Sequence, residues 1–170
     1  MTPILKPIAA SFRTTNSILE LRLGDIDEED ARKRVRNGEG PSIAWEVGHM
    51  LDHRCKVLAL LGVAKESPYA AKYTAAGASD GSDYPDTADY RRQWSQVYTE
   101  LEAAMEAATP ESLGRIAEQG AHGEKTALDS IMFLTWHEAY HVGAVGSIRK
   151  ELGYPGPAEL VMANVKAARQ

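Results

Sequence analysis

The sequence predicts an all-α protein, a four-helix bundle with a long crossover connection and short extra helices. Four long segments repeat apolar residues at three- and four-residue steps, which is typical of amphipathic helices. No segment shows the alternation expected of a strand, and a polar stretch, 64–85, separates the second and third helical segments. With 170 residues and a hydrophobic fraction of 44%, we expect a single domain over residues 1–170.

The first two helices are predicted from periodicity and from their boundary residues. Apolar residues recur through 4–23, and the next residue is a glycine, which ends the first helix. Residues 25–40 carry acids first and bases last, as suits a short exposed helix aligned with its own dipole. Ser42 is a good N-cap for the second helix, which we expect over 43–62.

The second half of the chain predicts two more long helices. The third begins near Asp86 or Thr87 and carries a regular apolar row to residue 108. The fourth covers 126–152 and ends before a glycine and a proline. The tail, 158–168, predicts a short last helix lying over the bundle.

The fourth helix holds two histidines in its expected core-facing row. That row reads Ala127, Ile131, Leu134, His137, His141, Val145, Ile148 and Leu152. Because His137 and His141 are four residues apart, both side chains can reach one metal ion. The alternative is that both are core histidines whose nitrogens form hydrogen bonds within the protein. The two histidines alone do not distinguish a metal site from this alternative.

His49, on the second helix, would complete an open three-ligand metal site. A helical projection nevertheless puts it nearly opposite the apolar row of its own helix, which includes Cys55 as a packing residue. Either that helix is buried on two sides, for example by a partner subunit, or His49 faces solvent. We expect His53 to be a surface residue rather than a fourth ligand. His122 lies in a glycine-rich turn, and we expect it to be a loop residue.

Residues 137–141 read H-E-x-x-H, a motif that also occurs in zinc peptidases. If this chain were such a peptidase, Glu138 would be its general base. A peptidase needs a third ligand further along the chain. Ala144 and Ser147 stand where the extended motif requires glycine and histidine, and no histidine follows His141. A peptidase is therefore disfavoured.

Composition excludes several other functional classes. A net charge of -5 and the lack of a basic recognition helix argue against nucleic-acid binding. The single cysteine, Cys55, cannot form a disulfide within the chain. No apolar run approaches the roughly 18 to 20 residues that cross a bilayer. We expect a cytoplasmic protein that does not bind membranes.

Three stretches resemble the DinB-like (DinB/YfiT) metalloenzyme superfamily. Residues 27–62 have that family's serine N-cap, tryptophan-bearing turn and metal histidine, and residues 86–115 have the character of its third helix. Residues 123–153 are similar to its last helix, with H-x-x-x-H, a following glycine and the Arg-x-x-Leu-Gly ending. The resemblance lies in the order and spacing of these stretches, since no one of them is specific alone.

The resemblance implies a homodimeric four-helix bundle that binds a divalent ion, zinc or nickel, through His49, His137 and His141. Relatives include thiol S-transferases, so we expect a small-molecule substrate, with a low-molecular-weight thiol as a candidate. The metal would activate a thiol or a water for attack on an electrophile. A non-catalytic, stress-related metal-binding module and a zinc-dependent hydrolase are the alternatives.

Four further residues of the fourth helix are assigned roles within this hypothesis. Glu138 is a candidate catalytic residue, as a proton shuttle or as a partner of a ligand. Arg149 is a candidate for binding an anionic substrate, with a structural salt bridge as the favoured alternative. Trp136 and Tyr140 are expected to be packing residues.

Overall fold

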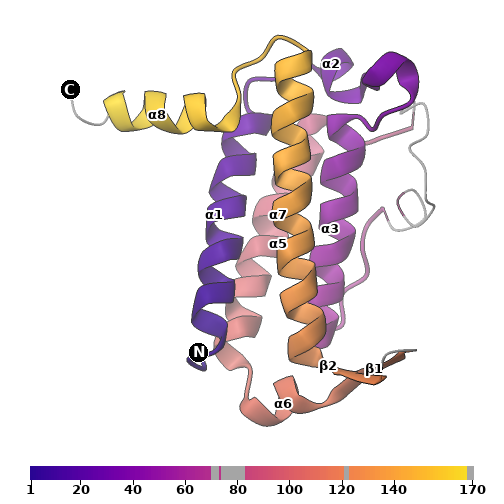
Figure 1. Ribbon diagram of the computed structural model, residues 1–170, viewed down its shortest axis with the longest axis vertical. Coiled ribbons are helices and arrows are strands. Elements are labelled where there is room, and N and C mark those ends of the chain that lie inside the picture. The colour runs from indigo at the N-terminus through magenta and orange to yellow at the C-terminus, as the bar shows by residue number, and fades with distance from the viewer. Residues whose placement is uncertain (70–72, 74–82, 121–122, 168–170) are drawn as a thin grey trace.

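The computed structural model describes residues 1–69, 73, 83–120 and 123–167. Four long helices run side by side along its longest axis (Figure 1): α1 (Leu5–Leu23), α3 (Ile43–Leu60), α5 (Thr87–Ala107) and α7 (Ala127–Glu151). Helix α1 contacts α5 and α7, and α3 contacts the same two helices, so the four enclose one core. The predicted four-helix bundle is confirmed. Among the described residues, no helix combines the length and apolar composition needed to span a membrane.

Side-chain caps fix where three of these helices begin. The hydroxyl of Ser42 accepts a hydrogen bond from the backbone N–H of Trp45 (3.1 Å), which satisfies one of the free donors at the start of α3. Asp86 caps α5 in the same way. At α7, Thr126 and Asp129 form a reciprocal capping box. These caps lie where the sequence predicts them.

The direction of the helices explains the long connection (Figure 1). Helix α3 ends at the end of the bundle where α7 begins, and α5 begins at the opposite end, so α3 and α5 run the same way. The segment that joins two helices running in the same direction has to span the whole length of the bundle. This is the long crossover connection that the sequence predicts. Much of the predicted connection, and His122, lie outside the described residues.

Short elements close both ends of the bundle. Besides α2 (Glu28–Arg32) and α6 (Pro110–Gly114), the described residues include a 3-10 turn (Arg36–Gly38) and an antiparallel hairpin of β1 (Ile116–Gly120) and β2 (Gly123–Thr126). The expectation of no strand is therefore wrong. The hairpin lies outside the core and its side chains are largely exposed, so it has no buried face to produce alternation.

The last helix, α8 (Pro157–Ala167), does not cover the bundle as the sequence predicts. It contacts α1 and then projects away from the other helices (Figure 1). Val161, Met162 and Val165 are 40 to 67% exposed. The helix itself is present, but no other described part of the chain buries these three side chains.

The buried side of α7 is shifted from the row that the sequence predicts. Its core-facing residues include Ile131, Thr135, Glu138, Val142, Val145 and Arg149. Leu134 and His137 are only partly buried. Polar Thr135 and Glu138 thus occupy core positions that an apolar pattern cannot reveal, and His137 lies at the edge of the core.

Candidate metal centre

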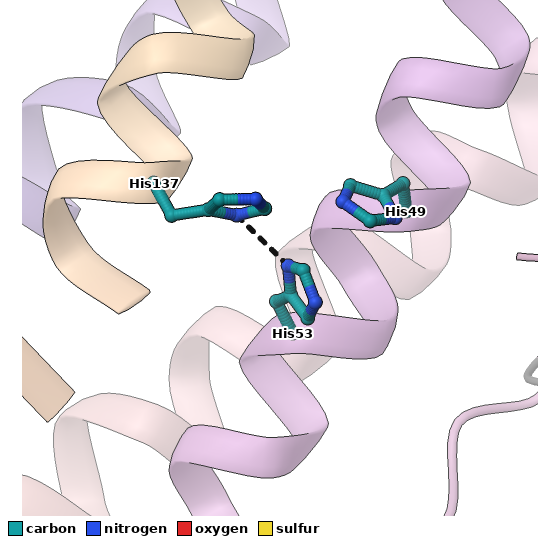
Figure 2. A group of neighbouring side chains, drawn as sticks. All are labelled: His49, His53 and His137. Atoms are coloured by element: carbon teal, nitrogen blue, oxygen red, sulfur yellow. Dashed lines mark hydrogen bonds between the residues drawn. The ribbon is translucent and has the colours of Figure 1, made fainter. Parts of the chain in front are cut away.

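Four histidines meet between α3 and α7. His49 and His53 come from α3, and His137 and His141 from α7. Five of the ring pairs have centroids 4.3 to 5.2 Å apart, so the imidazoles form one contiguous cluster. Figure 2 shows the His137 ring reaching across from α7 toward the two rings of α3.

The sequence spacing and the packing of the helices together build this cluster. Each helix carries its histidines four residues apart, so each pair lies on one face. The two helices pack side by side in opposite directions, which brings the faces together (Figure 1). His49 therefore faces α7 of its own chain, and α3 is buried on two sides by α5 and α7 without a partner subunit. The expectation that His53 is a surface residue is wrong, because it is half-buried within the cluster.

Hydrogen bonds link three of the rings and a buried carboxylate. Nδ1 of His53 lies 2.9 Å from Nδ1 of His137. Nε2 of His137 lies 3.1 Å from Nε2 of His141. Nδ1 of His141 contacts the carboxylate of Glu46, which is 3% exposed. Each contact uses a different ring nitrogen, so the groups form one continuous chain.

His49 is held differently from the other three. Its ring stacks on Trp45, with centroids 4.7 Å apart and planes 12° apart. Its Nδ1 is buried and, among the described residues, has no partner with hydrogen-bond geometry. An interaction with the backbone of Tyr73 raises the pKa of His49, but by less than burial lowers it. A buried polar atom without a partner is costly, and a bound cation would satisfy it.

The cluster fits a divalent metal ion. Ligand nitrogens of His49, His53 and His137 all lie within 4.8 Å of one another, and His141 adjoins them through His137. Two nitrogens bound to one zinc at about 2.0–2.1 Å in tetrahedral geometry are separated by about 3.3 Å, close to the His137–His141 spacing. Neutral imidazoles suit zinc, copper, iron and nickel. The donor set therefore matches a transition-metal site.

The environment favours the neutral form of His49, His53 and His137, which is the form that binds a metal. Burial lowers the pKa of His49 to about 4, with His141 and His137 adding to the effect. Burial lowers the pKa of His53 to about 3, with His49 as the next cause. The pKa of His137 is lowered by burial and then by His141. Near neutral pH, few protons compete with a metal for these nitrogens.

The metal-free protein should become less stable as the pH falls below about 6.5. In the unfolded chain His49 and His53 titrate near 6.5, whereas in the folded chain their pKa values are about 4 and about 3. Between these values the unfolded chain binds more protons, so the free energy of unfolding falls with falling pH. Each ring contributes at most about 1.4 kcal/mol per pH unit, and less in practice because the rings are only half-buried.

Urea unfolding of chelator-treated protein, at several pH values between about pH 7 and pH 5, measures how the free energy of unfolding changes with pH. A His49→Gln variant is the matched control and should show a shallower dependence. An identical slope in the variant, or a stability that does not change over this range, would contradict the assigned environment.

Glu46 is a site residue that the sequence analysis missed. It lies in the first turn of α3, and its carboxylate contacts His141 across the helix interface. A carboxylate behind a histidine orients the ring and strengthens it as a metal ligand. Its position three residues before His49, on the same side of the helix, is a signal that could have identified it.

Glu138 points away from the histidines and into the bundle core. Its oxygens accept hydrogen bonds from Nε and Nη2 of Arg54, at 2.8 and 2.9 Å, and one also contacts the hydroxyl of Thr15. Glu138 and Arg54 are 2% and 0% exposed. This buried ion pair joins α7 to α3. The predicted catalytic role of Glu138 stays a prediction, and its carboxylate is engaged elsewhere in this structure.

Arg149 is also fully buried, two turns beyond His141. Its guanidinium donates to both carboxylate oxygens of Asp25, at 2.8 and 3.0 Å, and to the backbone carbonyls of Arg22 and Pro155. These contacts join α7 to the end of α1. They form a structural salt bridge, which is the alternative that the sequence favours for Arg149. Binding of an anionic substrate by Arg149 stays a prediction.

The outer face of α7 departs from the prediction. Trp136 and Tyr140 are 63% and 62% exposed, so their expected role as packing residues is wrong. With Met132 and Phe133 they form an exposed apolar strip beside the cluster. The ring centroids of Phe133 and His137 lie 5.8 Å apart, and those of Tyr140 and His141 lie 5.1 Å apart.

A cleft of about 510 Å³ lies near His141, although none of the four histidines lines it. Its walls include Glu46 and Tyr140, which both contact His141, together with Val35, Ala144 and Ile148. The cleft is large enough for a small molecule. An enzyme requires a pocket near its metal site, and this cleft reaches the cluster through Glu46 and Tyr140.

The comparisons with known proteins agree with this architecture. The model of the DinB superfamily matches residues 11–145. Among solved structures, the chain is similar to YfiT from Bacillus subtilis, with a TM-score of 0.67, 13% sequence identity and 91% of each chain covered. YfiT is described as a probable metal-dependent hydrolase with an unusual four-helix bundle topology. No curated protein matches the sequence.

Proposed function

The chain belongs to the DinB superfamily, and from this premise we propose that it is a divalent-metal-dependent enzyme with His49, His137 and His141 as its ligands. The observation that carries the proposal is the clustering of imidazoles between α3 and α7. Nitrogens of His49 and His137 lie within 4.8 Å of each other, and Nε2 of His141 lies 3.1 Å from Nε2 of His137. The unpartnered Nδ1 of His49 and the carboxylate behind His141 add support. Zinc and nickel both suit such a set of neutral ligands.

His49, His137 and His141 would hold the ion as neutral ligands, and an ion that keeps its full charge would lower the pKa of a bound water or thiol. The protein's own residues hold and orient the ligands, and the adjoining cleft would bind the substrate. Cys55 does not supply the thiol, because it is buried and burial raises its pKa to about 11. A thiol nucleophile would therefore be a low-molecular-weight co-substrate.

We propose thiol transfer to a small electrophilic molecule as the reaction. Hydrolysis is the second candidate, and the description of YfiT as a probable metal-dependent hydrolase favours it. The nucleophile is a thiol in the first reaction and a water in the second. A screen of the zinc- and nickel-loaded protein should therefore pair activated aryl halides with several cellular thiols, and activated esters with water alone.

His141→Ala protein is the control for this screen, since it should lose both metal and turnover. Thiol-dependent turnover that vanishes in the variant supports transfer, and thiol-independent ester cleavage that vanishes supports hydrolysis. Metal content that is the same in the variant and the wild type would sink the assignment of His141.

A non-catalytic metal-binding module predicts a different response to chelation. Removal of a structural ion should lower the thermal stability strongly, whereas removal of a catalytic ion should abolish turnover with a smaller change in stability. Calorimetry before and after chelation separates the two. The cleft beside Glu46 favours the catalytic alternative.

We also propose that the protein is a homodimer formed through the outer face of α7. Met132, Phe133, Trp136 and Tyr140 are each more than half exposed on this helix, and contiguous exposed apolar residues often mark an interface. Trp136→Glu should convert the dimer to a monomer in size-exclusion chromatography with light scattering. Thr99→Glu, on the exposed side of α5, is the control and should remain dimeric. A monomeric wild type, or a dimer that survives Trp136→Glu, would contradict the proposal.

A further inference from the structure

A chain of hydrogen bonds runs from Glu46 through His141 and His137 to His53. The contacts are Glu46 carboxylate to His141 Nδ1, His141 Nε2 to His137 Nε2 at 3.1 Å, and His137 Nδ1 to His53 Nδ1 at 2.9 Å. The three proposed ligands account for two of its three rings. His53 is the ring that the proposed function does not use.

The carboxylate gives this chain of hydrogen bonds a direction. An ionised carboxylate only accepts hydrogen bonds, so Nδ1 of His141 carries its proton and Nε2 is bare. The bare Nε2 accepts from Nε2–H of His137, whose Nδ1 is then bare. That nitrogen in turn accepts from Nδ1–H of His53. With each ring neutral, every tautomer is therefore assigned by the hydrogen-bond pattern.

Metal binding is incompatible with part of this arrangement. His141 keeps its tautomer, because its bare Nε2 is the nitrogen available to a metal. His137 has to give up the proton on Nε2 if that nitrogen is to bind the same ion. Its proton then belongs on Nδ1, which faces Nδ1 of His53 at hydrogen-bond distance.

We propose that His53 is a positioning residue, which accepts the Nδ1–H of His137 when Nε2 of His137 binds the metal. Metal binding then reverses the tautomers of both rings, and His53 carries its proton on Nε2. In this arrangement Glu46 holds His141 and His53 holds His137, so each ligand of α7 has its own partner on α3. The inference rests on the proposed function, since it takes His137 and His141 as ligands.

A competing ligand set consists of His49, His53 and His137, whose nitrogens lie within 4.8 Å of one another. It would leave His141 outside the site. One observation favours His53 as a partner instead. The buried carboxylate orients His141, as is typical of a metal ligand.

Titration with Zn²⁺ and Co²⁺ tests this inference in wild type, His53→Ala, His53→Asn and His141→Ala, with circular dichroism to verify folding. We expect His53→Ala to keep one binding site and its Co²⁺ absorption spectrum, with affinity lower by about 10- to 100-fold. His53→Asn, whose side-chain oxygen can accept a hydrogen bond, should recover part of the loss. His141→Ala should lose the site.

Nitrogen-15 spectra of the histidine rings provide the second measurement. Zinc should move the His137 proton from Nε2 to Nδ1 and leave the His141 proton on Nδ1. A His137 tautomer unchanged by zinc, or unchanged affinity in His53→Ala, would overturn the inference. Loss of the site in His53→Ala with retention in His141→Ala would establish the competing set. A wild type that binds neither ion would refute the proposed function itself.

Discussion

Replacing Arg54 with methionine is expected to lower the free energy of unfolding by about 3 to 5 kcal/mol, the range for removing one partner of a buried ion pair. The substitution leaves the carboxylate of Glu138, which is 2% exposed, without the cation that contacts both its oxygens. Arg54 also donates to Asn16 at 3.0 Å and lies 3.4 Å from the ring centroid of Trp94. Urea unfolding of the metal-free protein at neutral pH measures the loss.

Two further variants show whether the unpaired charge is the cause. The double variant Arg54→Met, Glu138→Leu should be more stable than Arg54→Met alone, because it removes the carboxylate that was left unpaired. Glu118→Gln breaks the exposed contact with Lys125 (3.5 Å) and should change stability by less than about 1 kcal/mol. Near-native stability of Arg54→Met would refute a structural role for the pair, and would return Glu138 to consideration as a catalytic group.

The second large effect is expected at His137, which lies at the centre of the cluster. His137→Ala should weaken zinc binding by more than the roughly 10- to 100-fold typical of losing an outer partner, because it removes a proposed ligand. At a free zinc concentration of about 100 times its Kd, the wild type should gain about 2.7 kcal/mol of stability. The variant should gain almost nothing at the same concentration.

Thermal unfolding with and without zinc measures this difference, and Lys150→Ala, exposed on the same helix, is the control. The control should keep the full stabilisation by zinc. Equal stabilisation of His137→Ala and wild type would show that zinc binds elsewhere.

Much of the fold follows from local signals in the sequence. Ser42, Asp86 and Thr126 each precede a periodic segment, and each caps a helix, because a short polar side chain satisfies the free backbone donors there. The i,i+4 spacing of His137 and His141 likewise follows directly from helix geometry. Such features depend only on residues within a few positions of one another.

The parts that the sequence did not predict depend on contacts between distant segments. Glu138 is adjacent to His137, yet it lies in the core because Arg54, 84 positions earlier, supplies its counter-charge. His53 has charged neighbours that suggest solvent exposure, but α7 covers it. Helical periodicity indicates which residues share a face and does not say which helix packs against it.

The metal content of protein isolated without chelator tests the central claim most directly. Elemental analysis by mass spectrometry, with His137→Ala protein prepared in parallel, should find about one divalent transition-metal ion per wild-type chain and almost none in the variant, because one open three-histidine site binds one ion. The absence of metal from the wild type even after incubation with zinc or nickel, or an equal content in both proteins, would contradict the assignment of this cluster as a metal centre.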